Sequence, residues 1–179
     1  MKLKPKNTTI REQDPVREYS RIFANDEKWM REALDEATKG YECGEIPIGA
    51  VLVQNDQIIA RNFNQREKTK NPLHHAEILV LEEGAKKIGT WRLSEVTLYV
   101  TLEPCPMCLG ALLQARVGRL VYGCLDPKRF QESGNFSFPT LKDHLSLSGN
   151  NHTVTISGPV LEEDCSQILK KFFKERRKK

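Results

Sequence analysis

Two short stretches of the sequence carry side chains that could bind a metal ion. They are His75–Glu77 and Pro104–Cys108. Residues i and i+3 of a helix share one face, so Cys105 and Cys108 could bring two thiolates to one point, at Zn–S distances of about 2.3 Å. A helix N-terminus at this place would lower the thiol pKa, because its unpaired N–H groups favour negative charge. The spacing therefore indicates a metal site at the start of a helix.

A third ligand from the first stretch would leave the metal open to water. His75 and the two cysteines make three protein ligands, so the fourth tetrahedral position of a zinc ion stays free. Glu77 lies two residues beyond the histidine, close enough to reach a water molecule there without serving as a ligand. Zinc lowers the pKa of such a water, and a carboxylate can take its proton and pass it on. We therefore expect Glu77 to be the catalytic acid and base.

Other interpretations of these residues are weaker. A lone C-x-x-C also occurs in redox pairs and in closed zinc sites, but the sequence has no second C-x-x-C and no H-x-x-x-H. His74 is a rival ligand, yet the residue two positions beyond it is Ala76, so the position of the acid favours His75. The remaining cysteines are expected to be buried thiols, and they are Cys43, Cys124 and Cys165.

Hydrophobic patterns place both stretches at helix starts. Residues 48–53 and 58–60 flank Asn55-Asp56 and indicate a hairpin, and residues 61–73 are expected to form a loop. The later alternation of strands and helices implies crossover connections, hence a mixed sheet with helices on its faces and both helix starts at one edge. The other expected elements are helices at 26–40 (capped by Asp26), 74–88, 105–116 and 161–177, and strands at 96–101, 120–124 and 152–156.

Length and charge bound the domain organisation. The 179 residues suit one domain. Residues 1–24 are polar and are expected to form a mobile extension before a single domain at residues 25–179. Seven of the 28 basic side chains lie within residues 170–179, beside one acidic side chain. Such a basic end is either a solvated tail or a contact for a polyanion.

The composition also bears on location. The longest apolar run, Ile46–Val53, is far shorter than the roughly 18 residues of a membrane-spanning helix. Nothing in the sequence resembles a secretory signal. We therefore expect a cytoplasmic protein without membrane association, whose five cysteines are reduced.

The motifs H-x-E and P-C-x-x-C together are the signature of zinc-dependent base deaminases, and the sequence resembles the tRNA-specific adenosine deaminases. The resemblance runs from about Trp29 to Arg177 and includes the stretches Ile46–Val51, Thr97–Cys105, Arg116–Arg119 and Asp126–Lys128. It implies a cytidine-deaminase-like three-layer α/β/α fold, with a mixed five-stranded sheet, and a homodimer. It also implies one zinc ion per subunit, no nucleotide cofactor, and conversion of the wobble adenosine of a tRNA anticodon stem-loop to inosine.

The resemblance assigns roles to individual residues. It implies that His75, Cys105 and Cys108 bind zinc and that Glu77 transfers protons. Asn64 matches the asparagine that hydrogen-bonds the flipped nucleotide. Further RNA contacts are expected from the loop residues Asp126 and Lys128 and from the basic end, where Lys174, Arg176 and Arg177 would face the RNA backbone while Phe172 and Phe173 anchor the closing helix.

Some residues depart from the family pattern and keep other functions open. The family often has D-P-T-A-H-A-E where this chain has Asn71–Glu77, and Pro104–Ala111 also resembles bacterial guanine deaminases. One alternative is therefore a deaminase of free guanine or cytosine, or of a nucleoside. Another is a non-catalytic RNA-binding module that zinc stabilises. The basic C-terminal helix favours an RNA substrate, because a small uncharged substrate needs no cationic surface.

Overall fold

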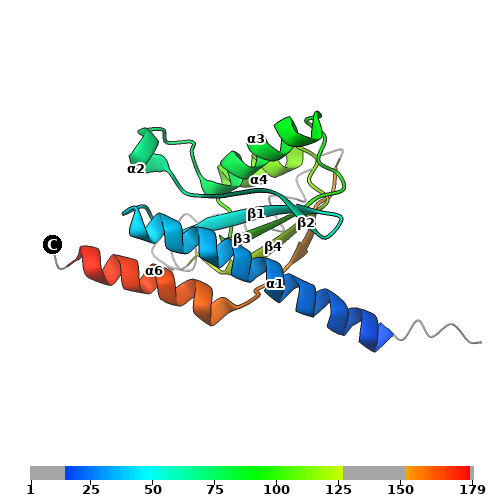
Figure 1. The fold of residues 1–179 in the computed structure, drawn as a ribbon, viewed down its shortest axis with the longest axis horizontal. Coiled ribbons are helices and arrows are strands. Elements are labelled where there is room, and N and C mark those ends of the chain that lie inside the picture. The colour runs from blue at the N-terminus through cyan, green and yellow to red at the C-terminus, as the bar shows by residue number, and fades with distance from the viewer. Residues whose placement is uncertain (1–14, 127–151, 178–179) are drawn as a thin grey trace, which may run out of the picture.

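The computed structural model describes residues 15–126 and 152–177. Its centre is a five-stranded sheet in the order β2-β1-β3-β4-β5 (Figure 1). Strand β1 is antiparallel to both β2 and β3, whereas β3, β4 and β5 are parallel to one another. The predicted mixed sheet is therefore confirmed. Its strands are β1 (Gly49–Gln54), β2 (Gln57–Phe63), β3 (Thr97–Leu102), β4 (Arg119–Cys124) and β5 (Thr155–Ser157).

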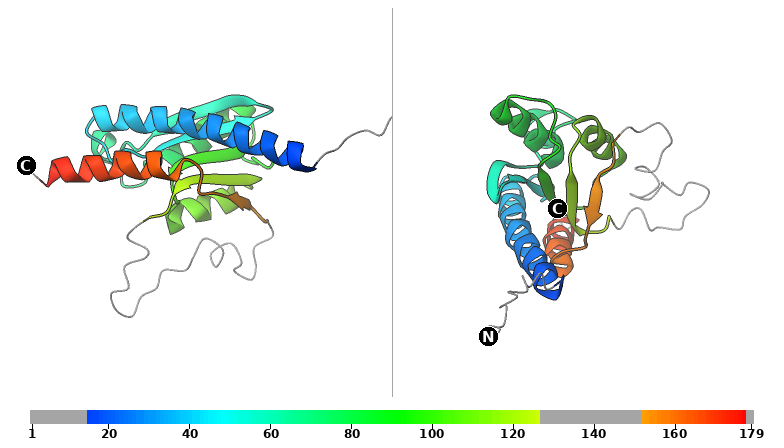
Figure 2. Two further views of the ribbon diagram at one scale, coloured as in Figure 1. Left: turned by 90° about the horizontal axis from the view of Figure 1, so that it is seen from below. Right: turned by 90° about the vertical axis from the view of Figure 1, so that its right-hand side faces the viewer.

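Helices cover both faces of this sheet, as Figures 1 and 2 show. On one face lie α1 (Pro15–Glu42) and α6 (Glu162–Arg176), side by side, and on the other lie α3 (Ala76–Ile88) and α4 (Pro106–Gln114). A short helix, α2 (Arg66–Thr69), interrupts the connection from β2 to α3. The architecture is the three-layer α/β/α fold that the family resemblance implies. No helix within the described ranges is both long and apolar enough to cross a membrane.

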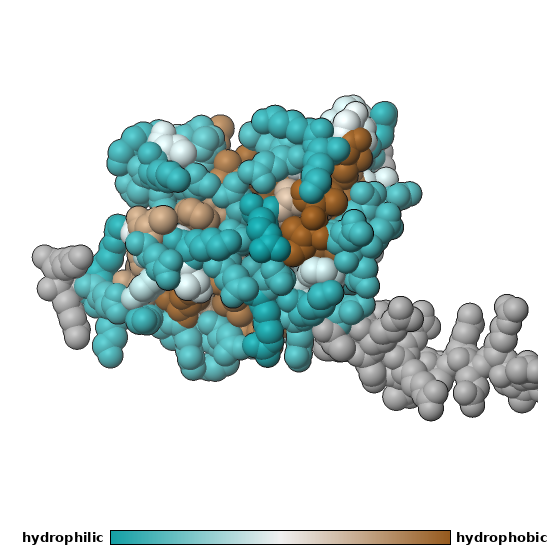
Figure 3. Space-filling model, in the orientation of Figure 1, coloured by the Kyte–Doolittle hydropathy of each residue, from teal (hydrophilic) through white to brown (hydrophobic). Residues whose placement is uncertain are grey.

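The alternation of side chains along the strands creates two cores. In β1, Ala50 and Leu52 pack toward α3 and α4, whereas Val51 and Val53 pack toward α1 and α6. Successive residues of a strand point to opposite faces, which is why one buried strand serves both layers. Most of the surface in Figure 3 is hydrophilic, with smaller hydrophobic patches, one of them between α1 and α3.

Two local features fix the first hairpin and its packing. Asn55 and Asp56 have φ values of 50° and 59°, the two positive angles of a type I′ turn, which confirms the predicted hairpin. A Cβ atom at Gly49 would lie 2.0 Å from the carbonyl oxygen of Ala33. Only glycine therefore lets α1 lie this close to the start of β1.

The start of α1 differs from the prediction. The helix begins at Pro15, and Asp26 is not its N-cap but a buried residue within it, 4% exposed. The Asp26 carboxylate accepts hydrogen bonds from both terminal nitrogens of Arg119, at 2.7 and 2.6 Å, and from the Tyr99 hydroxyl at 2.9 Å. The proposed end of the extension at residue 24 thus falls inside a helix, and residues 1–14 lie outside the described residues.

Smaller differences concern loops and strand ends. The expected loop at residues 61–73 contains the end of β2 and the helix α2. The last strand is β5, somewhat later than the expected residues 152–156. Cys124 and Cys165 are buried as expected, but the prediction for Cys43 is wrong, because it is exposed just beyond the end of α1.

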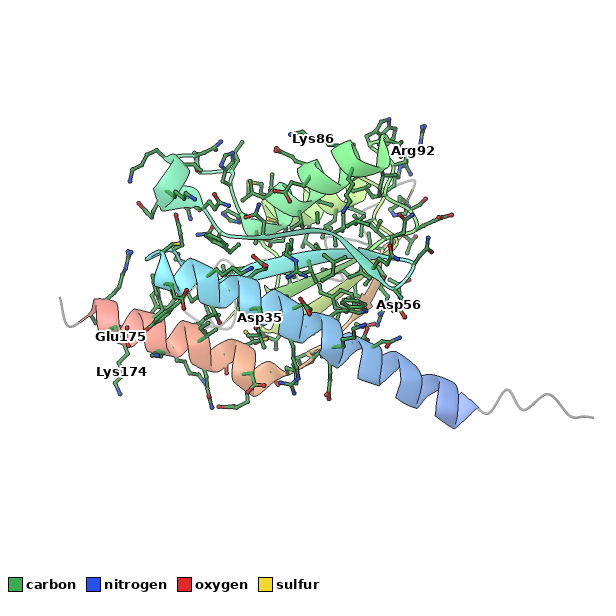
Figure 4. The ribbon with its side chains drawn as sticks, viewed as in Figure 1. Asp35, Asp56, Lys86, Arg92, Lys174 and Glu175 are labelled. Carbon is green, nitrogen blue, oxygen red and sulfur yellow. The ribbon has the colours of Figure 1, made fainter. Side chains whose placement is uncertain are left out.

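Asp26→Ala should reduce the free energy of unfolding by about 3 kcal/mol, because it leaves the Arg119 guanidinium partly buried without its carboxylate. Urea denaturation measures this change. Asp35→Ala is the matched control, since Asp35 is an exposed residue of the same helix (Figure 4), and it should change the free energy by no more than about 0.5 kcal/mol. Equal unfolding midpoints for the two variants would contradict the importance of the buried ion pair.

Candidate active site

Two helix starts carry the metal-binding side chains. His75 is the N-cap of α3 and Cys105 is the N-cap of α4, and both have extended backbone angles. Pro106 occupies the first turn of α4, where a missing N–H costs nothing. Cys108 follows in that first turn and is fully buried. The two helices lie on one face of the sheet, so their N-termini meet at one edge, as the sequence predicts.

The three side chains form one cluster. The Nδ1 atom of His75 lies 3.7 Å from the Cys105 sulfur and 3.5 Å from the Cys108 sulfur, and the sulfurs are 3.6 Å apart. A tetrahedral zinc ion with ordinary bond lengths would separate two sulfurs by about 3.8 Å and a sulfur and a nitrogen by about 3.6 Å. The donor set and its spacing therefore fit zinc. Among the described residues, these three form the group of metal-binding side chains.

Charge in the cluster is concentrated on Cys105. The hydrogen bond between Cys105 and Cys108 is the main cause that lowers the pKa of Cys105 to about 3, and a hydrogen bond with His75 adds to it against the opposing effect of burial. The hydrogen bond between the two cysteines raises the pKa of Cys108, as do burial and the nearby Glu77. The Cys105 thiolate in turn raises the pKa of His75. A cation is needed before both sulfurs can be thiolates at this separation.

Glu77 lies in the first turn of α3, next to the cluster, and is 4% exposed. Burial raises the pKa of its carboxyl group, while its own backbone N–H and the charge of His75 lower it. Burial is the larger effect, so the group is closer to neutrality than an exposed glutamate. Such a carboxyl can both accept and donate a proton near neutral pH.

His74 is not part of the cluster. It directly precedes the ligand, but its Nδ1 atom is buried without a hydrogen-bond partner in the described part of the chain. The choice of His75 over His74 from the position of the acid agrees with the geometry of the cluster.

A cavity of about 760 Å³ opens at the cluster. His75, Glu77 and Cys105 are among the residues that line it, and α6 forms one wall. The volume is typical of small-molecule sites. The wall from α6 presents Glu162, Glu163, Ser166, Leu169, Lys170, Phe173 and Arg177.

Comparison with known proteins then gives the family. The MafB19-like deaminase family model matches residues 24–177. A tRNA-specific adenosine deaminase of Bacillus subtilis is 51% identical over 157 residues, which cover 88% of this chain and 94% of the relative. The chain belongs to the tRNA-specific adenosine deaminase family.

Solved structures of this deaminase family and of its neighbours share the fold. One, from a study of A-to-I editing by tRNA:A34 deaminases at the wobble position of transfer RNA, has a TM-score of 0.70 and 38% identity, and the match covers 79% of this chain and 99% of that chain. A guanine deaminase from Bacillus subtilis has a TM-score of 0.56 and 28% identity, over 86% of this chain and 94% of that chain. The deaminase fold is thus common to enzymes with different bases as substrates.

Three residues are expected to contact the nucleotide near the metal, and they are Asn64, Asp126 and Lys128. Asn64 is buried, 3% exposed, and its amide donates a hydrogen bond to Glu45. Asp126 lines the cavity, and its N–H donates to Glu103 at 3.3 Å. Lys128 lies outside the described residues.

The basic residues of α6 point in different directions. Arg177 lines the cavity, and its contact with RNA stays a prediction. Arg176 instead donates to the Gly44 carbonyl at 2.6 Å and lies over the ring of Phe172, so it ties α6 to the end of α1. Lys174 is exposed and extends away from the body (Figure 4). Phe172 is buried as predicted, whereas Phe173 lines the cavity.

Lys170 lines the cavity together with Arg177, although it is not among the residues predicted from the sequence. The two residues are seven positions apart, a spacing that keeps them on the same face of a helix. The same periodicity also places Lys174, four positions after Lys170, on this side of the helix, so the sequence alone does not separate Lys170 from Lys174.

Cys105→Ala should reduce the zinc content of the purified protein from about one ion per chain to nearly none, because two ligands hold zinc far less tightly than three. Metal analysis by mass spectrometry measures this directly. Cys43→Ser replaces an exposed cysteine outside the cluster and should keep the metal. Full zinc content in Cys105→Ala would mean that the ligand set is wrong.

Proposed function

We propose that this chain binds one zinc ion per subunit and hydrolyses the wobble adenosine of a tRNA anticodon to inosine. The observation that carries the proposal is the buried carboxyl of Glu77 beside a cluster with three ligand atoms, in the lining of a cavity. Three protein ligands leave one tetrahedral position for a water molecule. The names of the family's other members supply the substrate.

In the proposed reaction, the zinc ligands hold the metal and Glu77 transfers the protons. When bound, zinc acts as a Lewis acid that makes water a better nucleophile. Glu77 takes a proton from the attacking water as its oxygen bonds to C6 of adenine. The same carboxyl delivers this proton to N1, then takes the remaining proton of the oxygen now bonded to C6 and delivers it to the amino group, which leaves as ammonia when the bond from C6 to the amino nitrogen breaks. Its raised pKa suits both directions of transfer.

The walls of the cavity support an RNA substrate over a free base. Lys170 and Arg177 line the cavity from α6, and cations at this place suit phosphate groups that flank a flipped nucleotide. A free guanine or cytosine would not use them. A non-catalytic RNA-binding module is also a poor match, because a purely structural zinc site is usually closed by four protein ligands.

We also propose that the chain is a cytoplasmic homodimer. An apolar groove lies between α3 and α4, away from the wall formed by α6, and the side chain of Trp91 beside it is 53% exposed. Such a surface is costly to leave in water. A second copy of the chain is the partner that the family resemblance implies, and reduced cysteines at the metal site suit the cytoplasm.

The purified protein should release ammonia from an anticodon stem-loop with adenosine at the wobble position, and not from free adenosine, cytidine or guanine. Glu77→Gln should keep its zinc but lose turnover by about 100- to 10,000-fold, because it removes the group that transfers protons. Inosine formation and metal content measure the two effects. Turnover of guanine without turnover of the stem-loop would contradict the proposed substrate, and an active Glu77→Gln would contradict the mechanism.

Replacing both Lys170 and Arg177 by alanine should weaken stem-loop binding and lower the slope of log Kd against log salt by about two, one for each lost phosphate contact. Lys86→Ala is the control, since Lys86 is an exposed lysine of α3, far from α6 (Figure 4). A titration at several salt concentrations gives the slopes. An unchanged slope in the double variant would show that these cations do not contact RNA.

A further inference from the structure

A buried carboxylate with no role in the proposed chemistry lies between α1 and β1. Glu45 is 1% exposed, and three donors converge on it. Its Oε2 atom accepts hydrogen bonds from the Asn64 side-chain amide at 3.1 Å and from the Glu67 N–H at 3.2 Å. Its Oε1 atom accepts from the Lys68 N–H at 2.6 Å. A buried charge is tolerated only with such partners.

Glu45 holds the short helix α2 in place. Gln65, the N-cap of α2, makes no capping hydrogen bond with its side chain, and a helix of four residues is not stable by itself. The N–H groups of Glu67 and Lys68 in its first turn are satisfied by Glu45 instead. The backbone of Glu45 is in turn anchored, because its N–H donates to the Gly40 carbonyl at 2.9 Å.

The same carboxylate sets the orientation of the Asn64 amide. All three partners of the Glu45 carboxyl group are donors, so its oxygens act as acceptors and the NH₂ group of Asn64 faces it. This leaves the Asn64 carbonyl oxygen and the second amide hydrogen for other partners. The flipped amide would instead place an oxygen against the carboxylate, which is unfavourable.

The two segments that Glu45 contacts, Asn64 and the helix α2, are each hydrogen-bonded to a residue of the active site or its direct neighbour. The N–H of Asn64 donates to the carbonyl of Ile48, a residue that lines the cavity. At the start of α2, the N–H of Gln65 donates to the carbonyl of His74 at 3.0 Å, directly before the metal ligand. Displacement of α2 would therefore disturb the nucleotide side of the site and the chain that carries the metal ligand.

We infer that Glu45 is a positioning residue for deamination, which fixes the Asn64 amide and the α2 segment so that the nucleotide is held in the reactive geometry. This inference rests on the proposed contact between Asn64 and the nucleotide. Glu45 itself touches neither the metal cluster nor the substrate. A displacement of about 1 Å at such a site costs up to about 100-fold in rate.

The test is a double-mutant cycle on an anticodon stem-loop, with kcat, KM, zinc content and thermal unfolding measured for Glu45→Gln, Asn64→Ala and the double variant. A neutral amide at this position has one oxygen for three donors, so Glu45→Gln should lower kcat/KM by about 10- to 100-fold while zinc stays bound. Because Glu45 acts partly through Asn64 and partly through α2, the loss in the double variant should be smaller than the product of the two single losses. Glu45→Asp keeps the charge and should recover part of the activity.

Glu36→Gln is the matched control. Glu36 is also a buried glutamate, 3% exposed, but it pairs with Lys39 and Arg61 away from the cavity, and its variant should keep kcat/KM near that of the unchanged protein. The inference would be overturned if the loss of kcat/KM in the double variant equalled the product of the two single losses. It would also be overturned if Glu45→Gln lowered kcat/KM no more than Glu36→Gln does. If Glu45→Gln does not fold, the same cycle with Glu45→Asp decides. Unchanged kinetics in Asn64→Ala would instead contradict the proposed nucleotide contact itself.

Discussion

The convergence of two helix N-termini at one edge of the sheet is the constraint on which the active site depends. His75 and Cys105 are the N-caps of α3 and α4, so their positions follow from the backbone and not from flexible side chains. The crossover from β3 through α4 to the parallel strand β4 fixes α4 against the sheet, and α3 packs beside it. Helix N-termini also favour the thiolates that a zinc ion requires. One packing arrangement therefore supplies both the geometry and the charge.

Both acidic and basic side chains line the cavity. The two sulfurs of the metal cluster and the buried Glu77 lie within a small volume, an arrangement that a divalent cation stabilises. The wall from α6 adds the cations Lys170 and Arg177 beside the acidic residues Glu162 and Glu163. The position of α6 is maintained by contacts with the end of α1, including the hydrogen bond from Arg176 to Gly44. Arg176 at the basic end of the chain thus has a structural role, and the proposed RNA contacts concern Lys170 and Arg177.

Features determined by neighbouring residues could be predicted from the sequence, and features determined by distant partners could not. The metal ligands, the hairpin turn and the helix starts at His75 and Cys105 all depend on local spacing. The side chain of Asp26 suits a helix cap as well as it suits a buried ion pair, and nothing near it in sequence reveals Arg119. Glu45 is a single acid without a pattern, and only the folded chain brings α2 to it.

Zinc K-edge X-ray absorption on the purified protein tests the central claim of an open three-ligand site most directly. The geometry predicts two sulfur scatterers at about 2.3 Å and two lighter ones, nitrogen and oxygen, at about 2.0 Å. The Glu77→Gln spectrum should be the same, since Glu77 is not a ligand. Three or four sulfurs, a single sulfur, or a coordination shell that changes in Glu77→Gln would contradict the account.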